Sequence, residues 1–192
     1  MSLSIYTVKH PLALNWSSHI RNREVEQNQR IELIQKLSIS LIYEALRNLV
    51  QVDHLYLKSL NHIHELHILA NNPICIISSN SSLLNMLFRD LTFFIPNLTL
   101  SNKFADNNPE IQNTTKEYSL TNNTSSKNII ILEENLDCKK MLTTINQLSG
   151  KERGVQKLTV CCIDCHTTQL QELGETYNKL DIYTVNIISD NI

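Results

Sequence analysis

Glycine is almost missing from this sequence. Of 192 residues only Gly150, Gly154 and Gly174 are glycines. Many nucleotide-binding folds hold a phosphate group in a glycine-rich loop, because glycine accepts the positive φ values that turn several amides towards one anion. The composition therefore argues against a phosphate-binding loop of that kind.

A basic excess, a long apolar run and an export signal are also missing. The formal net charge is −2, whereas general nucleic-acid binders carry a surplus of Lys and Arg. No apolar stretch reaches the roughly 20 residues that cross a bilayer, and the first residues resemble neither a secretory signal nor a transit peptide. We therefore expect no nucleic acid and no membrane among the partners. The five cysteines, without an export signal, fit a reducing compartment.

The chain has enough hydrophobic residues to form the core of one domain. Hydrophobic residues make up 42% of the sequence, so a packed core is expected. We predict a single domain over residues 1–192, with N-terminal helices and a hairpin over 1–70 and an α/β core over 71–192. Asn and Ile are abundant, and their codons are rich in A and T, as expected of a gene in an AT-rich organellar genome. This favours a plastid (chloroplast) protein and leaves the cytoplasm as the alternative.

The first third of the chain predicts two helices and a hairpin. Pro11 suits the first turn of a helix, and residues 28–49 carry apolar side chains at steps of three and four. In residues 52–69, apolar and polar side chains alternate on both sides of a turn near 59–61, which predicts a β-hairpin.

The rest of the chain predicts alternating strands and helices. Strands are expected at 73–77, 128–132, 157–163 and 181–187. The intervening helices are one from residue 81 with a serine cap and an end at Pro96, one over 138–149 capped by Gly150, and one over 167–173 stopped by Gly174. Residues 107–127 are expected to form a loop. This order predicts a mostly parallel sheet with flanking helices, in which ligands bind beyond the carboxyl ends of the strands.

Three stretches resemble uracil phosphoribosyltransferases. They are "HPL" (10–12) followed by Arg21 and by "YEA" (43–45), then "NIIILEEN" (128–135) before a helix, and "KLTVCCID" (157–164) with the following helix and strand. The resemblance implies a type I phosphoribosyltransferase fold, homo-oligomers, and an activity in pyrimidine salvage. That activity is transfer of phosphoribose from phosphoribosyl pyrophosphate to uracil, usually with Mg²⁺.

The chain departs from this family at the phosphate loop. Where the family has a Thr-Gly-Gly-Ser/Thr run, this sequence has residues 138–141, preceded by Asp137. Lys139 and Lys140 could contact a phosphate, but lysine accepts positive φ only at a cost, and Asp137 would repel the anion. A simpler interpretation is that Asp137 caps the helix and both lysines are solvated.

Glu133 and Glu134 lie where the wider fold class keeps an acidic pair that binds ribose hydroxyls. We interpret them as a vestigial ribose contact, with a solvated strand end as the alternative.

Two further parts of the family's site have no counterpart. The Arg-Ala-Gly run that approaches pyrophosphate is replaced by serines and Asn80 within residues 78–82, and hydroxyls bind a highly charged group less strongly than arginine does. The segment that closes the uracil pocket is also missing after the last strand. We therefore predict a homologue without catalytic activity (a pseudoenzyme), with no catalytic residue, no metal site and no cofactor.

Two alternatives stay open. One is an active phosphoribosyltransferase with a site rebuilt from Glu133, Lys139 and Lys140, and Mg²⁺. The other is a small-ligand or redox module, because Cys162 to His166 spell C-x-x-C-H, the string that attaches c-type haem. The string is explained equally well if its cysteines are small apolar residues of a buried strand. His62 and His64 share one strand face and could form half of a metal site, but a solvated hairpin is the simpler interpretation.

Overall fold

The computed structural model describes residues 3–22, 24–60, 62–70, 72–95, 97–102, 128–151, 157–177 and 179–189. The loop predicted over 107–127 lies outside these residues. The strands are β1 (Ser4–Thr7), β2 (Val52–Lys58), β3 (Ile63–Leu69), β4 (Ile74–Ser78), β5 (Leu98–Asn102), β6 (Asn128–Asn135), β7 (Lys157–His166) and β8 (Asp181–Ile188). The helices are α1 (Pro11–Arg21), α2 (Gln27–Leu46), α3 (Ser81–Leu91), α4 (Cys138–Lys151) and α5 (Thr167–Thr176).

Six strands form one parallel sheet in the order β1-β8-β7-β6-β4-β5. This confirms the predicted α/β architecture. The edge strands β1 and β5 were not predicted, because each is short and takes its hydrogen-bond partner from a different part of the chain.

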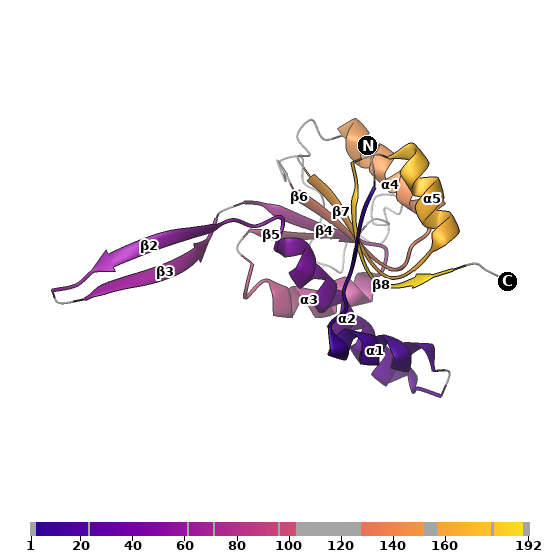
Figure 1. Ribbon diagram of the computed structural model, residues 1–192, viewed down its shortest axis with the longest axis horizontal. Helices are drawn as coiled ribbons and strands as arrows, with labels where there is room; N and C mark the ends of the chain where they lie inside the picture. Colours follow the sequence, from indigo (N-terminus) through magenta and orange to yellow (C-terminus); the bar gives the residue numbers. More distant parts are fainter. Residues whose placement is uncertain are drawn as a thin grey trace, which may run out of the picture.

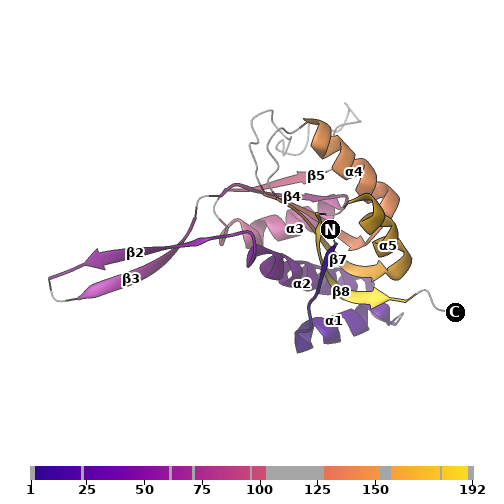
Figure 2. The same ribbon diagram turned by 45° about the horizontal axis from the view of Figure 1, so that its top comes forward.

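Helices cover both faces of this sheet. Figures 1 and 2 show α1, α2 and α3 on one side and α4 and α5 on the other. The strands alternate accordingly, so Ile130 packs towards α2 and α3 while its neighbours Ile129 and Ile131 pack towards α4. All three are almost fully buried, as expected for a parallel sheet with both faces covered.

The start of α1 explains why "HPL" occurs where it does. The imidazole of His10 accepts a hydrogen bond from the amide of Leu12, 3.2 Å away. Pro11 is the first helical residue, where its missing N–H costs nothing. The three residues thus form a local helix start.

Several predicted helix boundaries are wrong; α3, for example, ends at Leu91 and not at Pro96. Asn80, not a serine, caps α3, because its side-chain oxygen accepts the amide of Leu83 at 3.1 Å. Helix α4 continues through Gly150 to Lys151, and α5 continues through Gly174 to Thr176. One glycine costs a helix only about 1 kcal/mol, which burial of Leu148 and Leu173 outweighs.

The predicted hairpin, β2 with β3, is confirmed and stands away from the domain (Figures 1 and 2). All 14 of its strand residues are exposed. Because β4 begins just after β3, the hairpin leaves the domain at the amino end of β4. None of the helices within the described ranges is long and apolar enough to cross a bilayer.

Candidate functional site

The candidate site lies at the carboxyl ends of β4 and β6. These two strands are neighbours, but β4 continues through α3 to β5, whereas β6 continues through α4 to β7 on the other side. The chain therefore diverges here, which is the position where parallel sheets bind ligands. The segments that meet are residues 78–80, which begin with the last residue of β4, and residues 133–137, which run from the last residues of β6 to the start of α4.

Glu133 spans this divergence point. Its carboxylate accepts a hydrogen bond from the backbone amide of Ser79 at 3.0 Å and a second one from the Ser79 hydroxyl. Both residues are partly buried. The structure thus places Glu133 at the carboxyl edge of the sheet, in contact with the loop after β4; its contact with ribose stays a prediction.

Glu134 is paired with a cation. Its carboxylate accepts a hydrogen bond from the guanidinium of Arg30, in the first turns of α2. Sequence reasoning gave Arg30 no role, because the pair joins residues 104 positions apart.

Asp137 caps α4. Its carboxylate accepts the amide of Lys140 at 3.1 Å, and the Lys140 ammonium lies 3.4 Å from the other carboxylate oxygen. The hydrogen bond from the Lys140 amide is the main reason that the pKa of Asp137 is lowered. The capping interpretation is therefore confirmed, and one of the amides that a phosphate would use already has a partner.

The first turn of α4 shows no phosphate cradle. Lys139 and Lys140 are exposed, while Cys138 and Met141 point into the core. Among the described non-glycine residues only Asn97 has a positive φ, and no described glycine has one. The structure thus places Lys139 and Lys140 at the predicted position; their contact with phosphate stays a prediction.

A third carboxylate at this edge was missed from the sequence. Asp164, near the end of β7, accepts hydrogen bonds from Arg21 at 3.1 Å and from the side-chain amide of Asn186 at 2.7 Å. Asp164 and Asn186 are register partners in β7 and β8. That register could have indicated the hydrogen bond between Asn186 and Asp164.

Together these contacts pair the charged groups of this edge with partners from the chain itself. Glu133 is held by Ser79 and Glu134 by Arg30. Arg21 already faces Asp164. In the described part of this edge, an anionic ligand that used Arg21 or Arg30 would compete with the carboxylate that each of them faces.

The clearest hollow in the described structure lies elsewhere. It has a volume of about 510 Å³ and is open to solvent beside β1 and the carboxyl end of α2. Tyr6 stacks on Tyr183 at 4.8 Å there, and the Tyr183 hydroxyl accepts a hydrogen bond from the Asn48 amide at 2.7 Å. None of the predicted site residues lines it.

The C-x-x-C-H string lies on β7, and its two cysteines are buried, as the structural interpretation expected. Cys162 and Cys165 are both 0% exposed, and Cys165 donates to the Thr184 hydroxyl at 3.5 Å. The hydrogen bond between the two thiols raises the pKa of Cys162 and lowers that of Cys165 to about 7. Since haem attachment and disulfide exchange need an accessible sulfur, this environment does not favour either.

Comparisons with known proteins agree with this fold. A model of the family described as "Uracil phosphoribosyltransferase" matches residues 7–191. A uracil phosphoribosyltransferase homolog of Pyropia yezoensis is 24% identical over 97% of this chain and 89% of its own length. One of Porphyra purpurea is 23% identical over 100% of this chain and 92% of its own. The solved structure of the AQ2163 protein from Aquifex aeolicus matches with a TM-score of 0.70 and 16% identity, over 96% of this chain and 88% of that one. That structural likeness concerns the fold.

Proposed function

Since the chain belongs to the uracil phosphoribosyltransferase family, we propose that it keeps the family's fold but has lost phosphoribosyl transfer. The observation that carries this proposal is the bond between Glu133 and Ser79 across the divergence of β4 and β6. A donor pair that could meet a sugar or a pyrophosphate oxygen there instead binds a carboxylate of the chain itself.

Electrostatics support the same proposal. Transfer from phosphoribosyl pyrophosphate needs positive charge or preorganised donors at the departing pyrophosphate. At the described carboxyl edge Arg21, Arg30 and Lys140 each face a carboxylate. A pyrophosphate arriving here would meet neutralised cations and, at Asp137, a like charge.

The biological role we propose is that of a non-catalytic subunit or regulatory remnant in a plastid. Both curated relatives, from the red algae Pyropia and Porphyra, carry the word homolog in their names. The abundance of Asn and Ile, whose codons are rich in A and T, adds support for an organellar gene. A cytoplasmic location is the alternative.

We also propose that the chain forms homo-oligomers through the hairpin. One of its faces carries Leu55, Leu57, Leu66 and Ile68, which are each 43–48% exposed. A two-stranded hairpin has no core of its own in which to bury such side chains. A second copy of the chain, related by a two-fold axis, would present the same apolar face and cover them.

A turnover assay tests the loss of activity. The purified chain is incubated with labelled uracil, phosphoribosyl pyrophosphate and Mg²⁺, beside an active enzyme of the family as the positive control. We expect no UMP above the protein-free background. UMP formation that stops in Glu133→Gln or Lys139→Ala would instead establish the rebuilt site and overturn the proposal.

A further inference from the structure

The register of the hairpin brings two histidines and a glutamate onto one face. His54 of β2 pairs directly with His67 of β3, and Tyr56 pairs with Glu65. Glu65 and His67 are two residues apart on β3 and therefore point to the same side. His64 lies on the other face of β3, because it pairs with Leu57. The ring of His62, just before β3, lies 6.4 Å from that of His64.

The three side chains already lie close enough to share one ion. One ligand atom from each of His54, Glu65 and His67 falls within 4.8 Å of the others. The Nδ1 atom of His54 is 2.7 Å from a carboxylate oxygen of Glu65, and the imidazoles of His54 and His67 meet edge to face at 4.8 Å. Tetrahedral zinc needs ligand atoms about 3.4 Å apart, so small rotations of exposed side chains complete the geometry.

We propose that His54, Glu65 and His67 bind a Zn²⁺ ion that joins the two strands of the hairpin. Two imidazoles and one carboxylate form a donor set that zinc prefers, and they leave one position for water. All three residues are exposed, so an ion reaches them directly from solvent. The proposal is independent of the loss of transferase activity. The hairpin leaves the domain at the amino end of β4, whereas the candidate site lies at the carboxyl ends of β4 and β6.

Neighbouring groups favour the ion. The Tyr56 hydroxyl donates to the Glu65 carboxylate at 3.2 Å, which orients the carboxylate as an outer hydrogen bond does in metal sites. Zinc would replace the direct contact between the Nδ1 atom of His54 and the Glu65 carboxylate.

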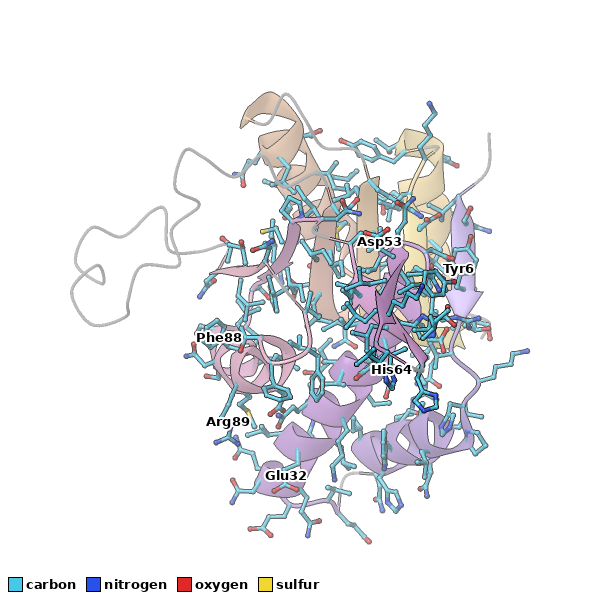
Figure 3. The ribbon with its side chains drawn as sticks, turned by 90° about the vertical axis from the view of Figure 1, so that its left-hand side faces the viewer. Tyr6, Glu32, Asp53, His64, Phe88 and Arg89 are labelled. Carbon is cyan, nitrogen blue, oxygen red and sulfur yellow. The ribbon has the colours of Figure 1, made fainter. Side chains whose placement is uncertain are left out.

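Calorimetric titration of the untagged full-length chain with ZnCl₂ at neutral pH tests the site. We expect one equivalent of zinc to bind per chain, and an affinity loss of at least about tenfold in His54→Gln/His67→Gln. The matched control is His62→Gln/His64→Gln, which removes two histidines from the same hairpin but from the opposite face. Figure 3 views the hairpin end-on and labels His64 of that face. We expect the control to bind zinc like the unchanged chain.

Cobalt(II) provides a second readout. Its visible absorption bands report imidazole and carboxylate coordination and should appear in the unchanged chain and the control only. Because the hairpin contributes nothing to the domain core, both double variants are expected to fold, and circular dichroism verifies this. No zinc binding by the unchanged chain, or equal affinity loss in both double variants, overturns the proposal.

Discussion

The carboxylate of Glu133 accepts hydrogen bonds from both the amide and the hydroxyl of Ser79. This contact ties the loop after β4 to the end of β6 at the point where a ligand of a parallel sheet would lie. Under the proposed loss of phosphoribosyl transfer, these two donors of Ser79 are satisfied by a carboxylate of the chain itself.

The first prediction concerns the stability given by this contact. Glu133→Ala should lower the free energy of unfolding by about 1 kcal/mol, because the partly buried amide of Ser79 loses its acceptor. The matched control is Glu134→Ala, whose partner Arg30 is half exposed; it should cost less than about 0.5 kcal/mol. Urea denaturation measures both. Equal costs would mean that the contact with Ser79 adds nothing specific.

The second prediction concerns the cap of α4. Asp137→Ala should destabilise the chain by about 1 kcal/mol, and Asp137→Asn by less, since Asn also caps helices. The lowered pKa of Asp137 sets the sign of the pH effect. The stabilisation is complete above the ordinary Asp value of about 3.9 and is lost as pH falls through the folded-state value.

Unfolding curves of the unchanged chain and Asp137→Asn between pH 2 and 7 test this dependence. The gap between them should be largest at neutral pH and shrink below about pH 4. A gap that grows with acidity would contradict the assigned role of the carboxylate.

The predicted α/β order and the buried strands followed from apolar runs, because a covered parallel sheet imposes continuous hydrophobicity. The contacts of Glu134 and Asp164 could not be predicted, because Arg30 and Arg21 come from helices far away in the chain. Only the three-dimensional packing of α1 and α2 on the sheet brings these charges together. The Asp137 cap, by contrast, is a local contact and was readable from the sequence.

The cross-strand pair of His54 and His67 could have been found from the sequence. The predicted turn near 59–61 fixes which residues face each other when the two strands pair without a bulge, as β2 and β3 do. The pair predicted from the sequence, His62 and His64, was instead chosen because histidines two apart on one strand share a face. Their rings lie 6.4 Å apart, with no carboxylate grouped with them in the described structure.

The third prediction concerns thiol reactivity. All five cysteines are free and buried, and burial also raises the pKa of Cys138 to about 11. Ellman's reagent should label no thiol rapidly in the native chain and all five after unfolding. Rapid native labelling that disappears in Cys162→Ala or Cys165→Ala would revive a redox role for this pair.

The fourth prediction concerns the apolar face of the hairpin. Leu55→Ser/Leu66→Ser should convert a homo-oligomer to monomers, because it removes two facing leucines from the surface that we propose a second copy covers. Sedimentation velocity measures the mass. The control Val52→Ser/Leu69→Ser removes a facing apolar pair from the opposite side of the hairpin and should leave the assembly intact. A monomeric unchanged chain would contradict the proposal.

The most direct test of the account is calorimetric titration of the chain with phosphoribosyl pyrophosphate and Mg²⁺, followed by uracil. Because Glu133, Glu134 and Asp137 already hold the donors and cations of the described site, we predict no saturable heat in either titration. Saturable binding that disappears in Glu133→Ala or Lys139→Ala would contradict the central claim, because it would show that the ligand displaces these contacts and binds where they now are.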